Sequence, residues 1–253
     1  MREFPTLRNP RVSPFFERSV QVLRNIRLLV LDLDYLVFDC VPLKLGALRQ
    51  SLISFADAIP QSVRLPDAMD AEEGYRDYGF RWTQYLEIGL GAERLAELQQ
   101  AYRIHEERLI EAGVGQIYPG LKELLEHFRR ENIDLALGAE ARRDYLLAVS
   151  DRHELDSVFQ TVLCTEEFGV GSIDEMLGEL MRHHEVNRSE TVVLGTRPAY
   201  FQAAHNLDLV TVGCGWGLHR HHRLGDADFQ ATTLSHLKSA LQEADNLAAR
   251  YLA

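Results

Sequence analysis

Two carboxylates, Asp32 and Asp34, stand at the end of an apolar run in the segment LLVLDLDYLVFDC, residues 28–40. The core of a strand normally excludes charge, so the two acids at this place need an explanation. Residues i and i+2 of an extended chain point to the same side, and both carboxylates can therefore face one ligand or one metal ion. We therefore treat Asp32 and Asp34 as the first candidates for a functional site.

The apolar run that carries these acids is one of several that alternate with amphipathic segments. Four runs predict buried strands and a fifth is weaker: 26–31, 133–138, 191–195 and 209–213, with 157–163 as the weaker one. Helical periodicity is clear in the segments 120–132, 142–153 and 174–186. Strands that alternate with helices predict a Rossmann-like parallel sheet of the α/β class. In such sheets ligands bind beyond the carboxyl ends of the strands, where Asp32 lies.

The alternation is interrupted once, between about Val41 and Gly115, where the sequence contains helical patterns and no convincing strand. We interpret this stretch as an inserted α-helical cap subdomain. The predicted organisation is an N-terminal extension over 1–25, an α/β core over 26–42 and 116–253, and a helical cap over 43–115.

Composition predicts an ordinary globular protein of 253 residues, with 46% apolar and 26% charged residues. A formal net charge of −11 disfavours binding to nucleic acid or to an anionic membrane. Three widely spaced cysteines without a C-x-x-C pair argue against a zinc site or a disulfide framework and fit a reducing cytoplasm. The proline-broken N-terminus predicts no signal peptide, and no apolar stretch is long enough to predict a membrane span. We expect a cytoplasmic protein. Its composition does not determine the oligomeric state.

The order of these features resembles the haloacid dehalogenase (HAD) superfamily. A strand ending in Asp-x-Asp is followed by a helical insertion and then by IYPGLKELLEHFRREN and three further strand–helix units. The chain is most similar to the phosphoglycolate phosphatase-like branch over about residues 26–245, with matches at FDC (38–40) and YPGLKELL (118–125). The resemblance implies that Asp32 is a nucleophile forming an aspartyl-phosphate and that Asp34 is the general acid/base. It also implies Mg²⁺ as the cofactor.

The chain departs from this family's pattern at its other motifs. Gly-Thr normally follows the acid pair, whereas this chain has Tyr35 and Leu36. The family has a hydroxyl residue at the end of the second strand, a Lys that neutralises the phosphoryl group, and a Gly-Asp-x-x-x-Asp motif that holds magnesium. The residues at those places are Gly138 or Ala139, Gly171 or Ser172, and Thr196 with Tyr200. The remaining expected roles are substrate contacts from Ala139, Ser172 and Arg197, and a weak magnesium site of Asp32, Asp34 and Thr196.

These departures predict phosphatase activity that is severely impaired or absent. Phosphoryl transfer depends mostly on positioning and electrostatic stabilisation, and one lost preorganised donor costs roughly 10²–10³ in rate. The replacements also have structural interpretations. Ser172 opens an S-x-x-E capping box with Glu175, and Thr196, close before Pro198, is a candidate helix N-cap.

Other candidates are weaker, and most favour a solvated or structural role. Glu140, with Arg142 or Arg197, is a candidate substitute for the lost ligands or the lost cation, and Asp39 lies near the cap hinge. The histidines are expected at a helix end (His183 and His184) and in a solvated loop (the run His219–Arg223, with His222). Aromatic and arginine side chains gather in residues 75–85, as the core of the cap, a substrate face or a partner patch.

Three hypotheses for function follow. The leading one is a HAD-like phosphatase-family protein with a degenerate site and weak or no Mg-dependent hydrolysis of phosphomonoesters. The second is an active hydrolase that uses non-standard ligands, with Asp32 as nucleophile. The third is a non-catalytic protein that binds a small phosphorylated metabolite or a protein partner through its cleft or the aromatic face of the cap.

Overall fold

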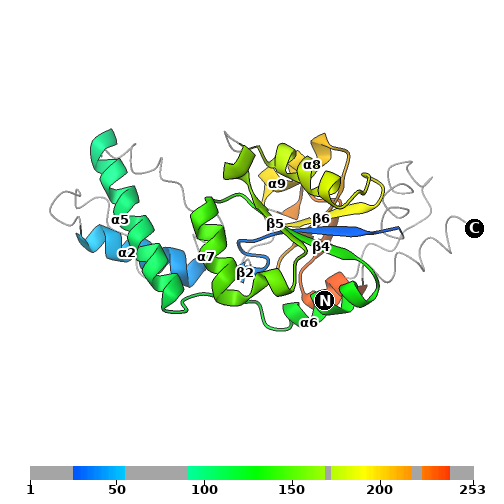
Figure 1. The fold of residues 1–253 in the computed structure, drawn as a ribbon, viewed down its shortest axis with the longest axis horizontal. Coiled ribbons are helices and arrows are strands. Elements are labelled where there is room, and N and C mark those ends of the chain that lie inside the picture. The colour runs from blue at the N-terminus through cyan, green and yellow to red at the C-terminus, as the bar shows by residue number, and fades with distance from the viewer. Residues whose placement is uncertain (1–24, 55–90, 169–171, 218–223, 240–253) are drawn as a thin grey trace, which may run out of the picture.

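A six-stranded sheet forms the centre of the molecule in the computed structural model, which describes residues 25–54, 91–168, 172–217 and 224–239 (Figure 1). Its strands pair in parallel throughout. In spatial order they are β5 (Thr161–Cys164), β4 (Asp134–Ala139), β1 (Leu28–Asp32), β6 (Thr191–Gly195), β7 (Val210–Cys214) and β8 (Phe229–Ala231). The predicted α/β class with a Rossmann-like parallel sheet is therefore confirmed.

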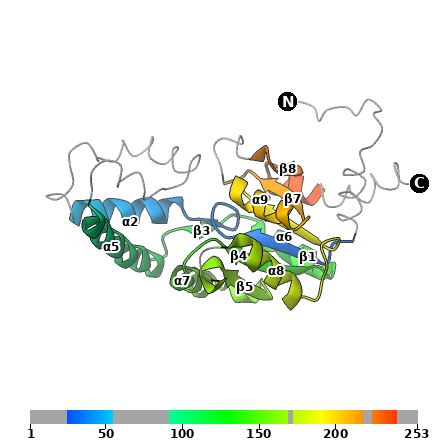
Figure 2. The same cartoon turned by 90° about the horizontal axis from the view of Figure 1, so that it is seen from above.

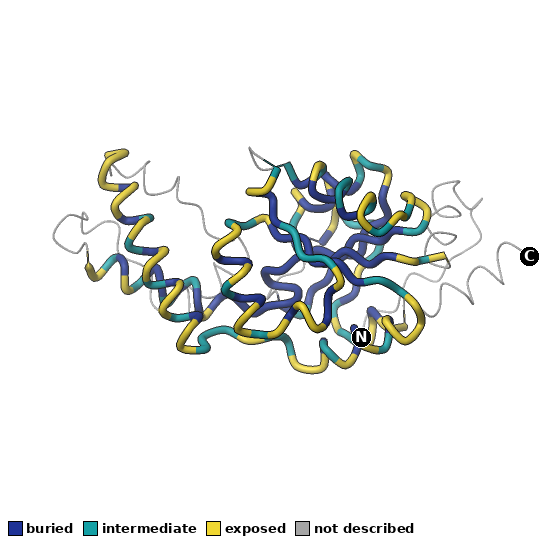
Figure 3. The backbone as a smooth tube through the Cα atoms, in the orientation of Figure 1, coloured by how far each residue is buried: buried dark blue, intermediate teal, exposed yellow. Residues whose placement is uncertain are grey.

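Helices cover both faces of this sheet, and the buried strands lie between them (Figure 3). The helices are α6 (Leu121–Arg130), α7 (Arg143–His153), α8 (Ile173–His183) and α9 (Pro198–Asn206). Successive residues of β1 point to opposite faces, so Leu29 and Leu31 pack with α6 and α7, whereas Leu28 and Val30 pack with α8 and α9. Two apolar layers therefore hold β1 and the acids at its end.

A helix pair is inserted after β1, in the part of 41–115 that the structure describes. The short strand β2 (Phe38–Asp39) pairs antiparallel with β3 (Gln116–Ile117), where the chain leaves the core and returns to it. Between them lie α2 (Val41–Ser54) and α5 (Ala92–Glu111), which run side by side away from the sheet (Figure 2). We call α2 and α5 the inserted helix pair. The cap boundaries at 43 and 115 stay predictions.

The weak strand expected over 157–163 is shorter in the structure. A 3₁₀ turn, η2 (Leu155–Ser157), occupies the approach to β5, and a second one, η3 (Thr165–Phe168), follows it. Buried Leu155, Val158 and Phe159 hold this approach as a turn. The predicted N-terminal extension, the aromatic stretch 75–85 and the run His219–Arg223 lie outside the described residues.

Candidate active site at the carboxyl ends of the strands

Asp32, the last residue of β1, is bound on both carboxylate oxygens by Arg197. The Arg197 Nη2 lies 3.1 Å from Oδ1 and 2.9 Å from Oδ2, and its Nε lies 3.0 Å from Oδ2. Its Nη1 donates to Glu140 at 2.6 Å. Asp32 is 1% exposed, so this is a buried, bidentate ion pair of the strong kind that a planar guanidinium forms with a carboxylate.

Asp34 is neutralised by a different cation. Lys44, in the first turn of α2, donates to Oδ2 of Asp34. The hydroxyl of Tyr145, in the first turn of α7, donates to Oδ1 at 2.8 Å. The Lys44 ammonium also lies over the Tyr145 ring, 4.9 Å from its centroid. Asp34 is thus held by one group from the inserted helix pair and one from the core.

Burial and ion pairing shift the pKa values of these groups in opposite directions. Burial raises the pKa of Asp32 to about 6, against the lowering effect of Arg197, and the charge of Asp34 adds to the rise. Burial would also raise the pKa of Asp34, but Lys44 and Tyr145 outweigh it and the pKa lies below its ordinary value. Burial would lower the pKa of Lys44, but Asp34 raises it, so the ammonium keeps its proton. Near neutral pH both acids are charged and each has its own cation.

Tyr35 keeps the tight turn after the acids even though glycine is usual there. Its backbone has φ 67°, in the left-handed region that favours glycine, and its side chain is buried. The loop after β7 closes over the turn, because Trp216 donates its indole N–H to the carbonyl of Leu36 at 2.9 Å. Gly217 lies so near that a Cβ on it would be 2.0 Å from the carbonyl oxygen of Tyr35. The turn is therefore covered by protein.

Tyr200 occupies the space next to the ends of β4 and β6. It is fully buried, and its hydroxyl donates to the carbonyl of Gly138 at 2.7 Å. A Cβ on Gly138 would lie 2.6 Å from that hydroxyl oxygen, so glycine at 138 makes the room that the ring needs. Ala139, at the end of β4, is buried and brings no hydroxyl. At these two motif positions the chain therefore has a packed aromatic ring and a glycine in place of polar side chains.

The two expected helix caps have different outcomes. The Ser172 hydroxyl accepts the backbone N–H of Glu175 at 3.0 Å and caps α8, as predicted. The N-cap of α9 is Arg197, with Pro198 at the first turn, so the prediction of Thr196 as N-cap is wrong. Thr196 is instead fully buried, and its Oγ1 has no hydrogen-bond partner among the described residues. The chain makes a bend at Thr196 and Arg197 between the end of β6 and the start of α9, and this bend buries Thr196 and brings Arg197 beside Asp32.

The weaker candidates separate in space. Glu140 joins the site through Arg197, whereas Arg142 bonds Glu106 and Asp144. Asp39 is buried in β2. His183 ends α8 and His184 follows it, and the Nδ1 of His184 lies 2.9 Å from Asp134 at the opposite end of β4. Sequence reasoning did not single out Lys44 or Tyr145.

The residues at this site do not fit magnesium in their present arrangement. Mg²⁺ binds carboxylate oxygens, so cations that are already paired with those carboxylates compete with it and repel it. Both oxygens of Asp32 and both of Asp34 accept hydrogen bonds from protein groups, and two buried cations stand beside them. Thr196 supplies a hydroxyl where a third carboxylate would be needed. No group of three or more His, Cys, Asp or Glu side chains that could hold a metal ion occurs in the described part of the chain.

A parallel sheet with acids at the end of its first strand, and helices inserted after that strand, defines an α/β protein with its site at the carboxyl edge. The family model of the haloacid dehalogenase-like hydrolases matches residues 30–214. The chain belongs to this family. No curated protein matches the chain, and no helix of the described residues is long and apolar enough to cross a membrane.

Solved structures share the fold at low identity. A haloacid dehalogenase-like hydrolase from Streptococcus pneumoniae is 16% identical with a TM-score of 0.71, covering 86% of this chain and 99% of its own. A predicted phosphoglycolate phosphatase from Haemophilus somnus is 14% identical with a TM-score of 0.68, covering 85% and 98%. CbbY from Rhodobacter sphaeroides, solved in complex with phosphate, is 14% identical with a TM-score of 0.64, covering 84% and 96%.

Proposed function

We propose that this chain is a phosphatase-like member of its family in which Mg-dependent hydrolysis of phosphomonoesters is severely impaired or absent, and that it acts by binding. The observation that carries this proposal is the bidentate pair between Arg197 and Asp32. A guanidinium takes both oxygens of the carboxylate that would have to attack phosphorus.

The energetic cost of freeing Asp32 supports the proposal. An aspartate nucleophile needs a lone pair directed at phosphorus. Breaking a buried ion pair by withdrawing one partner costs about 3–5 kcal/mol, which corresponds to a rate loss of about 10²–10⁴. This loss comes in addition to the missing hydroxyl at Ala139 and the missing carboxylate at Thr196. Together they leave ordinary phosphatase chemistry without its nucleophile and its metal site.

The proposed ligand is a small phosphorylated metabolite or a protein partner. Binding of either kind needs the fold and its surface but not a free Asp32. We also propose a cytoplasmic location, because the three cysteines of the chain are buried and free and a reducing compartment keeps thiols in that state.

The test is Mg-dependent hydrolysis of a broad panel of phosphomonoesters by the wild type and by Asp32→Asn, with a conventional phosphatase of the family as positive control. We expect equal, background-level rates in both proteins. Turnover that Asp32→Asn abolishes would overturn the proposal. It would instead support the hydrolase with non-standard ligands, in which Arg197 leaves Asp32 to bind the phosphoryl group.

A further inference from the structure

Two ion pairs connect the inserted helix pair to the core. Lys44 of α2 bonds Asp34, which follows β1. Glu106 of α5 bonds Arg142, the N-cap residue of α7, at 2.8 Å. The two contacts come from different inserted helices. If α2 and α5 moved together away from the core, both ion pairs would break.

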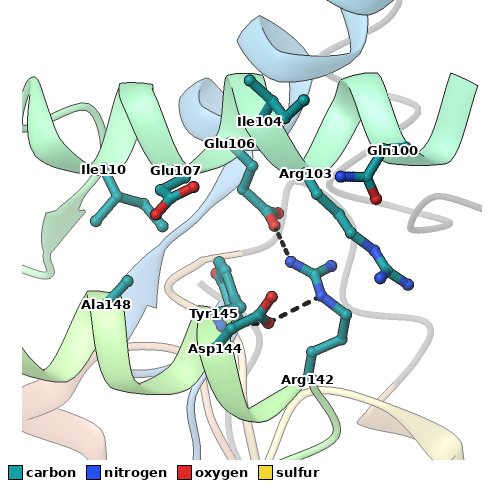
Figure 4. A pocket seen from close by; sticks show the side chains of 10 residues that line it. All are labelled: Gln100, Arg103, Ile104, Glu106, Glu107, Ile110, Arg142, Asp144, Tyr145 and Ala148. Carbon is teal, nitrogen blue, oxygen red and sulfur yellow. Dashed lines mark hydrogen bonds and ion pairs between the residues drawn. The ribbon is translucent and has the colours of Figure 1, made fainter.

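The acidic partner of the contact between Glu106 and Arg142 is buried more deeply than Asp34, the acidic partner of the other contact. The Glu106 side chain is 4% exposed and that of Arg142 is 27% exposed. Glu106 also accepts the hydroxyl of Tyr102 at 2.9 Å, and Arg142 is held from its other side by Asp144 at 2.9 Å. Figure 4 shows Glu106 reaching down from α5 to Arg142, beside a pocket of about 230 Å³ between the two helices. Without Arg142, the buried Glu106 carboxylate would keep one neutral donor.

Both contacts meet at the first turn of α7. Arg142 is the N-cap of this helix, and Tyr145 lies in its first turn. The Tyr145 hydroxyl bonds Asp34, and its ring lies beneath the Lys44 ammonium. Apolar packing continues the same interface, since Ile110 of α5 is buried in the core cluster that also contains Tyr145. One short segment of the core therefore fixes both inserted helices.

We propose that the inserted helix pair is latched closed on the core by Lys44–Asp34 and Glu106–Arg142, so that α2, α5 and the sheet behave as one rigid unit. The separation of the inserted helices from the core is a minor state, because it would break both ion pairs and expose the apolar contact made by Ile110. The latch does not require hydrolysis to be absent, because a closed and active enzyme would show the same contacts.

The test is a distance distribution between spin labels at Ala96→Cys on α5 and Glu123→Cys on α6. Both positions are exposed, and the three native cysteines are buried, so the labels attach selectively. The latch variant is Arg142→Gln. Its matched control is Arg143→Gln, because Arg143 bonds Glu167 within the core at 2.8 Å and does not bridge to the inserted helices through that pair.

We expect a single narrow distribution for the wild type and for Arg143→Gln. Arg142→Gln should add a second distance whose population is at least about tenfold larger than in the wild type, the effect of one hydrogen bond to a charged group. Two distances already present in the wild type, or equal distributions in Arg142→Gln and Arg143→Gln, would overturn the latch. Glu106→Gln, which keeps the size of the side chain and removes only its charge, gives the same test from the other partner of the pair with less risk to folding. A second distance or a broader distribution supports the latch, and an unchanged distribution argues against it.

Discussion

Arg197→Met is the substitution that most directly tests the role of the buried acid pair. Methionine keeps much of the apolar stem of the largely buried Arg197 side chain, which is 19% exposed, and removes the charge. Asp32 would then be a buried carboxylate without its cation, with Asp34 nearby. Breaking a buried pair in this way costs about 3–5 kcal/mol in the free energy of unfolding. We expect a loss of this size at pH 8.

The loss should depend on pH with a definite sign. Burial raises the pKa of Asp32 to about 6 in the folded wild type, whereas an unfolded chain has about 3.9. Between these values the folded state binds the extra proton, so stability from this group is full at low pH and falls as pH rises. Without Arg197 the folded pKa moves above 6, and the fall continues to higher pH by about 1.4 kcal/mol per unit. The cost of Arg197→Met should therefore be about 2–3 kcal/mol larger at pH 8 than at pH 5.5.

Urea unfolding at pH 5.5 and pH 8 measures this difference, because titrations shared by wild type and variant cancel. The control is Arg197→Met in an Asp32→Asn background, where the amide cannot titrate and the cost should be the same at both pH values. An equal cost in the wild-type background at the two pH values would refute the reasoning, because it would mean that Asp32 does not depend on Arg197 for its charge.

Three further predictions concern the positions around this pair. Thr196→Asp together with Arg197→Ser should raise magnesium affinity in calorimetric titration, because it adds a carboxylate and frees the first acid. Thr196→Asp alone should bind no better than the wild type, and an equal gain from the single change would contradict the blocking role of Arg197. Gly138→Ala should lower the free energy of unfolding by about 1–3 kcal/mol, because its Cβ would lie 2.6 Å from the Tyr200 hydroxyl. The same change should cost less in a Tyr200→Phe background, and equal costs would argue against this clash. Tyr35→Gly should relieve about 1 kcal/mol of left-handed strain but remove a buried ring worth about 3–5 kcal/mol. Thermal unfolding should show a net loss, and a neutral result would mean that the ring contributes little packing.

The sheet could be predicted from the sequence because its strands are long and apolar enough to be recognised. The runs at 133–138 and 209–213 differ from β4 and β7 by one residue at each end, and the run at 191–195 coincides with β6. The strands β2, β3 and β8 have only two or three residues. Such short segments show no recognisable alternation of apolar and polar residues. Their positions depend on where the chain returns to the core, and that is a tertiary effect.

The site could be predicted only in part. The end of an apolar run placed Asp32 at the carboxyl edge, and Arg197 was among the candidates for a substitute cation. Lys44 and Tyr145 carried no local signal, because each lies on a helix whose facing depends on packing with elements far away in sequence. The capping error at Thr196 has the same origin. A hydroxyl before proline fits an N-cap locally, but Arg197 takes the N-cap position of α9, and Thr196 is buried in the bend after β6.

The buried acids have a physical reason to persist without catalysis. A buried carboxylate costs several kcal/mol unless a cation pairs with it, and this chain supplies one cation for each acid. Once Arg197 and Asp32 are both present, removing Arg197 alone strands the buried Asp32 carboxylate, whereas removing Asp32 alone leaves Arg197 with Glu140 as its acidic partner. Asp32→Asn combined with Arg197→Met should therefore be closer to wild-type stability than Arg197→Met alone at pH 8, with a coupling energy of about 1–3 kcal/mol in the double-mutant cycle. A cycle that closes to zero would instead mean that the two side chains act independently, and the acids would then need a ligand to explain them.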